Sequence, residues 1–218
     1  MPHLTLLHDA VLNGDATAAQ ASTQNALAAG REPVRLVHDY MMPAMAEVGR
    51  RFECGEYYVP ELLLSARAMK AALAILRPLL ATAGVPPAGR VIIGTVQGDL
   101  HDIGKNLVAA VLEGGGFEVT DLGTDVPPEA FLDGVRERRA DIVALSALLT
   151  TTMPAMQATI AALERAGLRG QVKVLVGGAP LTKRFCDEIG ADGYSDNAPG
   201  AARVARGLLA ARGGAGRS

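Results

Sequence analysis

The feature that most constrains this chain is a change of hydrophobic rhythm close to residue 81. Before it, apolar residues recur at steps of 4, 3, 4, 3 and 4, in the order Leu62, Ala66, Met69, Leu73, Leu76 and Leu80. Such spacing places one apolar stripe along a helix. After it, short β-branched runs alternate with helical patterns. The sequence therefore predicts two parts with different folds, an α part followed by an α/β part.

Residues 1–82 are predicted to form a bundle of about four helices. Pro60 favours the start of the striped helix, because the N–H that proline lacks has no partner in a first turn. Further upstream, Asp15 is a candidate cap for a helix that ends near Gly30, and Pro33 is a candidate start for the next one. Periodicity alone favours a docking or dimerisation bundle.

Residues 83–89 are rich in proline and glycine and are predicted to be a linker between domains. Beyond them, the sequence predicts five strands, at 91–96, 117–122, 141–146, 172–176 and 192–194. Helices are predicted between and after them, at 103–115, 127–139, 153–167, 181–189 and 198–211. This alternation indicates a Rossmann-like or flavodoxin-like domain over residues 90–212, with a parallel sheet and helices on both faces. The last residues, 213–218, are predicted to be disordered.

Composition argues against several classes of function. The formal charge is −2, only 4% of residues are aromatic and there is no Trp, so we expect no nucleic-acid partner. Cys54 and Cys186 lie far apart in the sequence, which suits a reducing compartment. We find no signal-peptide pattern and no uncharged apolar run of about 18 residues, so we expect a cytoplasmic protein with no membrane partner.

The first strand is followed by a loop with an unusual pair, Asp99 and His101, two residues apart. A carboxylate at this spacing can accept one imidazole N–H and leave the other ring nitrogen free as a base or a metal ligand. Another interpretation is a solvated histidine beside a helix-capping aspartate. His101 is the only histidine of the α/β half, which argues against a multi-histidine metal centre. One His beside one Asp suits a metal whose other ligands come from a cofactor.

Hydroxyls and glycines surround the ends of the other strands. The third strand is followed by a cluster of small hydroxyls, Ser146, Thr150, Thr151 and Thr152, which could also be a threonine-rich helix cap. Gly94 lies within the first strand and Gly177–Gly178 follows the fourth; such glycines often mark the close approach of a ligand or another backbone. For Gly177–Gly178, an ordinary strand-to-helix turn is an equal alternative. Together these residues indicate a slot for a long, thin ligand.

These motifs resemble those of a known family. Asp99-Leu100-His101-Asp102-Ile103-Gly104 is similar to the DxHxxG motif of cobalamin-binding domains, Ser146-Ala147-Leu148 to their SxL, and Gly177-Gly178 to their GG. The helical half, from Met45 to Glu61, resembles the helical cap that precedes this domain in methionine synthase. Residues 30–205 are most similar to the small corrinoid proteins of methanol, methylamine and methoxyarene methyltransferase systems.

The resemblance implies a cofactor and a role for each matching residue. The cofactor would be cobalamin or a related corrinoid, in its methylcobalamin form during part of the cycle. By resemblance, His101 replaces the cofactor's own lower base on cobalt, Asp99 accepts its other ring N–H, and Thr152 stands third in this relay, where the family usually has Ser. The other cofactor-binding positions that it implies are Gly98, Asp102, Ile103, Gly104, Ser146, Leu148, Thr150, Gly177 and Gly178 in the α/β half and Phe52, Val59 and Leu62 in the helical half. The last three would cover the upper face of the cofactor; without the resemblance, core packing within the bundle is the favoured interpretation.

The implied function is that of a methyl carrier. A substrate-specific methyltransferase would load the methyl group onto cobalt(I), and a second, acceptor methyltransferase would remove it; a corrinoid-activating reductase is a further expected partner. A cobalamin-responsive sensor that acts through a protein partner is the alternative. An isomerase subunit has less support, because the chain contains no barrel domain for that chemistry.

Overall fold

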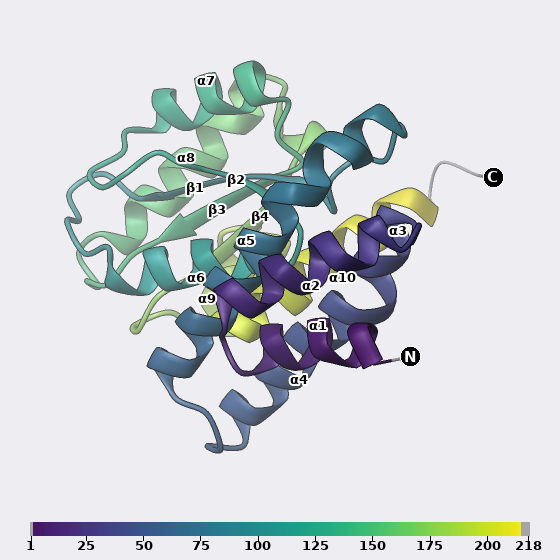
Figure 1. Ribbon diagram of the computed structural model, residues 1–218. Helices are drawn as coiled ribbons and strands as arrows, with labels where there is room; N and C mark the ends of the chain where they lie inside the picture. The colour runs from purple at the N-terminus through teal and green to yellow at the C-terminus, as the bar shows by residue number, and fades with distance from the viewer. Residues whose placement is uncertain (1, 215–218) are drawn as a thin grey trace. The chain divides into compact units, whose positions relative to one another are not determined.

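The computed structural model describes residues 2–214, and side chains are described from residue 5 to residue 211. The described residues fall into two compact units, drawn from Met1–Pro87 with Glu113–Gly116 and from Ala88–Leu112 with Phe117–Ser218. The first unit is helical and the second contains a five-stranded sheet. Figure 1 labels most of their helices and strands. No helix in the described part is long and apolar enough to cross a membrane.

The described part of the helical unit consists of four helical runs. They are α1 (Pro2–Leu12), α2 (Ala16–Ala28), a composite run over residues 33–53, and α5 (Val59–Thr82). As predicted, Asp15 caps α2, because its side chain accepts a hydrogen bond from the N–H of Ala18 at 2.9 Å. The predicted apolar stripe of α5 is buried from Leu62 to Leu76, while Leu80 is half-buried. The periodicity of the sequence therefore identified the buried face of α5.

The composite run contains a wide turn that the sequence analysis did not predict. Its segments are α3 (Pro33–Leu36), the π-helical turn η1 (Val37–Met41) and α4 (Met42–Glu53). The N–H of Met42 bonds the carbonyl of Val37, five residues back, just before Pro43. Since Pro43 has no N–H, it cannot continue the α-helical ladder, and the wider turn accommodates this interruption.

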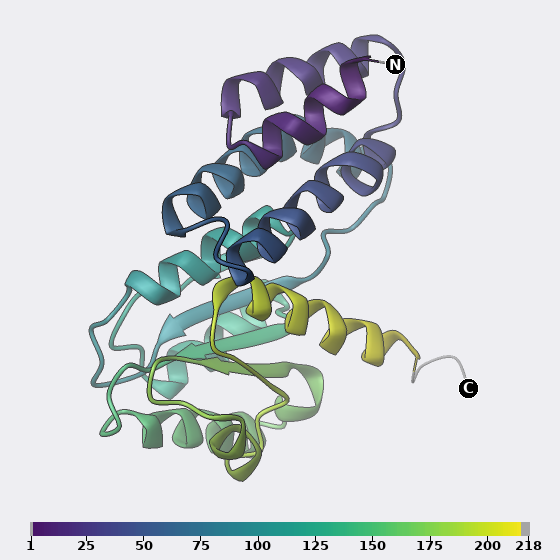
Figure 2. The same cartoon turned by 90° about the horizontal axis from the view of Figure 1, so that it is seen from below.

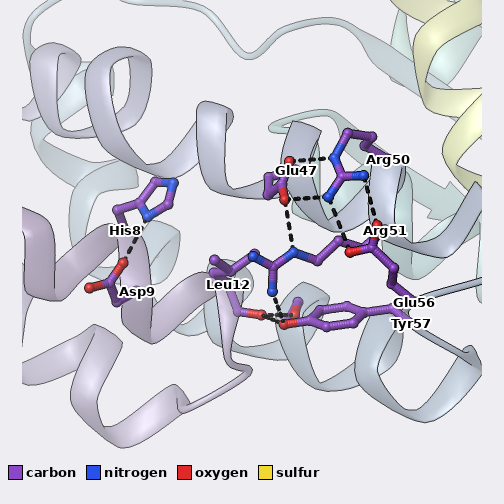
Figure 3. Close-up of polar contacts among 9 residues, drawn as sticks. His8, Asp9, Leu12, Glu47, Arg50, Arg51, Glu56 and Tyr57 are labelled. Carbon is purple, nitrogen blue, oxygen red and sulfur yellow. Dashed lines mark hydrogen bonds and ion pairs between the residues drawn. The ribbon is translucent and has the colours of Figure 1, made fainter. Parts of the chain in front are cut away.

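A network of charged and aromatic side chains holds the loop between α4 and α5 (Figure 3). Arg50 pairs with Glu47 on α4 at 2.8 Å and with Glu56 in the loop at 3.0 Å. Arg51 also bonds Glu47, donates to the hydroxyl of Tyr57 at 3.0 Å, and places its guanidinium 5.1 Å from the centre of that ring. Hydrogen bonds from Arg50 and Arg51 lower the pKa of Glu47 to about 2. The loop is thus fixed by a network, which orders it better than one exposed ion pair would.

The second unit is a parallel sheet in the order β2-β1-β3-β4-β5, which is the flavodoxin type. Its strands are β1 (Arg90–Thr95), β2 (Glu118–Asp121), β3 (Ile142–Ser146), β4 (Lys173–Gly177) and β5 (Gly193–Ser195). The fold class is confirmed, and each predicted strand end lies within one residue of the observed one.

Helices cover both faces of this sheet. They are α6 (Ile103–Gly114), α7 (Pro128–Arg138), α8 (Met153–Arg165), α9 (Lys183–Glu188) and α10 (Ala198–Gly214), with a short 3₁₀ turn, η2 (Arg169–Gln171), before β4. The helices α7, α8 and α9 pack on one face in a single apolar core that includes Phe131, Met156 and Cys186. Figure 2 shows α10, in yellow, on the opposite face, which also carries α6. The helix α10 continues to Gly214, two residues into the tail predicted to be disordered, and residues 215–218 lie outside the described residues.

Gly94 has a different role from the one that its position in a strand suggested. A Cβ at Gly94 would lie 2.8 Å from Cζ of Phe131 and 3.2 Å from Cγ2 of Val126. Gly94 therefore faces the core beneath α7, and an aromatic side chain occupies the space that we expected a ligand or another backbone to approach. That expectation is wrong for Gly94, because the pleat directs alternate residues of β1 to opposite faces.

We expect Gly94→Ala to lower the free energy of unfolding of the cofactor-free protein by about 1–3 kcal/mol, because Phe131 is fully buried and cannot move aside without strain. Urea denaturation followed by circular dichroism measures this. Gly104→Ala is the matched control, since a Cβ there meets no atom within 4 Å. A Gly94→Ala protein as stable as the wild type would contradict the packing argument.

Candidate functional site

The candidate site lies at the carboxyl ends of β1, β3 and β4, the edge of a parallel sheet where ligands commonly bind. Its centre is Asp99, which is fully buried in the loop that follows β1. Its Oδ1 accepts hydrogen bonds from the backbone N–H of His101 at 3.0 Å and from Nδ1 of the same residue at 2.6 Å. Its Oδ2 accepts from the N–H of Leu148 at 2.7 Å, the N–H of Leu149 at 3.3 Å and the hydroxyl of Thr152 at 2.7 Å. One carboxylate thus joins the loop after β1 to the loop after β3.

The hydrogen bonds decide the charge of Asp99. Burial by itself raises the pKa of this carboxyl, because a buried charge loses its hydration. The bonds from Leu148, His101 and Thr152 oppose that effect and hold the pKa of Asp99 well below its usual range. Asp99 is therefore ionised and acts only as an acceptor, so Nδ1 of His101 carries the proton that is shared between them.

The side chain of His101 is half exposed, at 51%, although its ring is held by a buried group. Within the described residues, its Nε2 has no hydrogen-bond partner. The carbonyl of His101 accepts a hydrogen bond from the hydroxyl of Thr95 at 2.7 Å, and Thr95 is fully buried at the end of β1. Thr95 is not among the site residues predicted from the sequence, although a hydroxyl at the end of an apolar strand was a usable signal.

The structure brings the three residues of the expected relay into one chain of hydrogen bonds, Thr152 to Asp99 to His101. Thr152 is buried at the start of α8, and its hydroxyl makes no capping bond to that helix. It donates its single proton toward Asp99 or toward the carbonyl of Leu149, at 2.9 Å. Asp99 does not cap α6, which begins at Ile103, so the interpretation of a capping aspartate is wrong.

Lys105, in the first turn of α6, is a buried cation that the sequence analysis missed. Its ammonium donates to Asp121 at the end of β2 and to the side-chain oxygen of Asn106 at 2.7 Å. Asn106 donates in turn to Asp102 at 3.0 Å. A buried ammonium is stable only when it is paired, so this contact fastens the start of α6 to β2. No local pattern identifies it, because Lys105 and Asp121 meet only through the fold.

A cleft of about 540 Å³ opens at this edge on the face of the sheet that carries α6 and α10. Its walls are mainly apolar and include Ile93, Ala144 and Leu175 from the sheet and Ala198 and Ala201 from α10. The predicted site residues in its lining are His101, Asp102, Ile103, Gly104, Ser146, Leu148, Gly177 and Gly178. Those outside the lining in this unit are Gly98, Asp99, Thr150 and Thr152. A volume of this size suits a small ligand or part of a large one.

Two glycines of the site are explained differently. Gly178 has a φ of +144°, and a Cβ there would lie 1.8 Å from the carbonyl oxygen of Ala147. Gly178 is therefore required by the close approach of another backbone. A Cβ added at Gly104 would meet no atom within 4 Å, so packing does not explain why this residue has no side chain. It leaves open space next to His101.

Large apolar side chains are exposed around the same loops. The exposed fractions are 73% for Leu100 and 85% for Ile103, and Leu148 and Leu149 are also exposed. Such a cluster is typical of a binding surface. In the helical unit, Phe52 is half-buried, Val59 is exposed and Leu62 is buried. Their role as a cover for the cofactor stays a prediction.

Comparisons with known proteins agree on one ligand class. Two family models match, each described as a B12 binding domain, over residues 89–203 and 4–77. The chain is 44% identical over 192 residues to trimethylamine corrinoid protein 2 of Methanosarcina acetivorans, which is 87% of this chain and 88% of the relative. A cobalamin-binding protein of Desulfitobacterium hafniense has a TM-score of 0.79 at 33% identity, covering 94% of this chain and 98% of that chain. The structure of the methanol:cobalamin methyltransferase complex MtaBC of Methanosarcina barkeri has a TM-score of 0.83 at 30% identity. This match covers 95% of this chain and 80% of that chain.

The residues present fit a corrinoid. His101 offers a half-exposed imidazole nitrogen as a ligand for cobalt, with the proton held on the other nitrogen by Asp99. The exposed side chains of Leu100 and Ile103 would offer an apolar surface to a flat macrocycle, and the space at Gly104 is open. Among the described residues, no group of three or more His, Cys, Asp or Glu side chains could hold a metal ion.

We expect Asp99→Asn to lower the free energy of unfolding of the cofactor-free protein at pH 7 by roughly 2–3 kcal/mol, because its amide cannot accept every hydrogen bond that the carboxylate accepts. Since the pKa of Asp99 is depressed in the folded protein, its stabilisation is present above the ordinary carboxyl pKa of about 3.9 and is lost as the pH falls below it. The difference between wild type and variant should therefore shrink in acid.

Urea denaturation at pH 7, 5, 4 and 3 measures this difference. Asp187→Asn, which removes an exposed pair with Lys183, is the control and should change stability little. A difference that stays constant across this pH range would contradict the assigned charge of Asp99.

Proposed function

The chain belongs to the family of B12-binding corrinoid proteins, and we propose that it carries methyl groups on its corrinoid between two methyltransferases. Corrinoid binding and a methyl-carrier role agree with the family models and with the relatives named above. The proposal adds that cobalt is held from below by His101, in place of the cofactor's own base. The observation that carries it is the pairing of a half-exposed His101 with a buried, ionised Asp99.

When bound, the corrinoid supplies a cobalt ion that can accept a methyl group and give it up again. The protein's part is to present one nitrogen in a fixed direction. Asp99 keeps the proton on Nδ1 of His101, so Nε2 has a lone pair for the metal. Thr152 and the N–H of Leu148 hold Asp99 from the opposite side. These contacts hold the imidazole in one tautomer and one orientation.

The cleft is proposed to take the displaced nucleotide tail of the cofactor. It is lined by residues at the ends of β1, β3 and β4 and by residues of α6 and α10, and its walls are mainly apolar. Ser146 is half-buried in this lining and offers a hydroxyl to the tail. Thr150 is exposed beyond the cleft, so any contact that it makes must be with another part of the cofactor.

The proposed partners follow from the chemistry of a carrier. One methyltransferase specific for the donor supplies the methyl group, and another transfers it to the acceptor. A reductase that restores cobalt(I) after accidental oxidation is part of the same proposal, because a nucleophilic low-valent metal is readily oxidised.

We expect His101→Ala to weaken the retention of hydroxocobalamin and to remove the splitting by a histidine nitrogen from the EPR spectrum of the cobalt(II) form. The physical reason is the loss of the only ligand proposed below the metal. The protein is incubated with hydroxocobalamin and desalted, and its visible and EPR spectra are recorded. Because cofactor bases also contain nitrogen, a wild-type sample labelled with nitrogen-15 histidine identifies the source of the splitting.

His8→Ala is the matched control, since His8 is also hydrogen-bonded to an aspartate, Asp9, at 3.0 Å. It should retain the cofactor and the splitting. Equal retention by His101→Ala and the wild type, together with a wild-type splitting that nitrogen-15 histidine leaves unchanged, would refute the proposed ligand. Transfer of a methyl group to a thiol by an added acceptor methyltransferase then tests the carrier role.

We also expect Gly104→Ala to weaken corrinoid retention about tenfold or more without destabilising the cofactor-free protein. An added Cβ enters space that is open in the protein, and alanine favours the helix over glycine. Equilibrium binding of hydroxocobalamin and urea denaturation separate the two effects. Unchanged affinity would mean that the corrinoid does not lie over Gly104.

A further inference from the structure

The loop between β2 and α7 contains a residue in an unusual backbone conformation. Asp125 has a φ of +52°, in the left-handed region that residues with a Cβ rarely adopt. Among the described residues other than glycine, only Arg139 shares this feature, with a φ of +49°. Arg139 caps the end of α7 before β3 begins, so it lies at the opposite end of the strands from the candidate site. Aspartate adopts this region more readily than most residues with a Cβ, so the contacts of Asp125 decide what the conformation does here.

Asp125 makes two hydrogen bonds to the loop that carries His101. Its Oδ1 accepts from the N–H of Gly98 at 2.7 Å, and its own N–H donates to the carbonyl of Asp99 at 2.9 Å. Gly98 is itself in the left-handed region, with a φ of +86°, where the chain turns away from β1. Asp125 therefore binds the turn on both sides of the peptide unit that joins Gly98 to Asp99.

The backbone beside Asp125 is fixed to the sheet. The N–H of Val126 donates to the carbonyl of Thr95, and the N–H of Thr95 donates to the carbonyl of Gly123, both at 3.0 Å. Val126 and Val96 also form a parallel bridge beyond the end of β2. These contacts extend the pairing with β1, so Asp125 is a fixed point to which the turn can be attached.

Two sets of hydrogen bonds, from two different loops, fix the side chain and the main chain of Asp99. Its side chain is held by the loop after β3, through Leu148 and Thr152, whereas its main chain is held by Asp125 in the loop after β2. The ring and the N–H of His101 both bond the same oxygen of Asp99. A shift of the main chain at Asp99 would therefore move that oxygen and turn the imidazole.

We propose that Asp125 is a positioning residue that orients His101 through Gly98 and Asp99, and that its left-handed backbone is maintained for this purpose. Asp125 itself does not line the cleft. The proposal rests on the proposed function in one respect, since it takes His101 as the cobalt ligand. The hold of Asp125 on the loop can be measured without any cofactor.

Three variants separate the parts of this argument. Asp125→Gly removes the accepting oxygen but relieves the left-handed strain. Asp125→Asn keeps an accepting oxygen and tolerates the same backbone, because asparagine is enriched in this region. Arg139→Gly relieves the same strain away from the site and is the matched control.

The first measurement is amide hydrogen exchange of the cofactor-free proteins, read by NMR at Gly98 and His101. In Asp125→Gly we expect faster exchange at both amides, by about tenfold. The amide of Gly98 loses its acceptor, and the turn, held now only by the N–H of residue 125, lets Asp99 and its bond to the amide of His101 move. Asp125→Asn and Arg139→Gly should exchange at these positions like the wild type. Exchange at the amide of His101 is informative because Asp125 does not touch it.

The second measurement uses hydroxocobalamin. Asp125→Gly should bind it about tenfold more weakly and show a broadened or reduced histidine nitrogen splitting in the cobalt(II) EPR spectrum, while its thermal midpoint stays at or above that of the wild type. Asp125→Asn should restore both properties. Wild-type exchange at His101 together with wild-type affinity in Asp125→Gly would overturn the proposal.

The two proposals fail in different ways. If the wild type shows no histidine nitrogen on cobalt, the proposed ligand is wrong, and the exchange data on the cofactor-free protein alone decide the role of Asp125. If the wild type shows the histidine nitrogen but Asp125→Gly matches it in exchange, affinity and spectrum, only the positioning role is refuted.

Discussion

The arrangement of the site depends on one buried carboxylate. Asp99 is surrounded by donors from two loops, and these donors keep it ionised although it is removed from water. A buried charge is tolerated only where hydrogen bonds replace its hydration. For this reason, the loops after β1 and β3 must hold their relative positions if Asp99 is to remain satisfied. The orientation of His101 is a direct consequence, because its ring bonds the same carboxylate.

The surrounding fold supplies the rigidity that this arrangement needs. A parallel sheet in the order β2-β1-β3-β4-β5 places β1 beside β3, so their following loops emerge side by side. The pair of Lys105 and Asp121 fastens the far end of the histidine loop, and Gly178 lets the loops after β3 and β4 approach closely. Gly178 and the pair of Lys105 and Asp121 thus fix the loops whose neighbouring residues, Asp99 and His101, form the site. Gly104 is the exception, because its open space serves no packing contact within the described part of the chain.

Much of the fold could be predicted because its signals are local. A cap at Asp15, an apolar stripe along α5 and β-branched runs separated by helical patterns each lie within a short window of sequence. The π turn before Pro43 was missed, since a proline can interrupt a helix in several ways. Gly94 was misinterpreted because the sequence does not say which face of a strand meets an aromatic ring from α7.

The sequence by itself determined the two kinds of periodicity, the parallel sheet and the residues of the histidine loop, because backbone preferences and motif spacing depend on near neighbours. It also provided the resemblance to corrinoid proteins that the comparisons bear out. Only the tertiary structure decided that Thr95, Lys105 and Asp125 support that loop. Their partners lie as many as 27 residues away in the chain or on another element, and such contacts form only when strands pair and bring distant loops together.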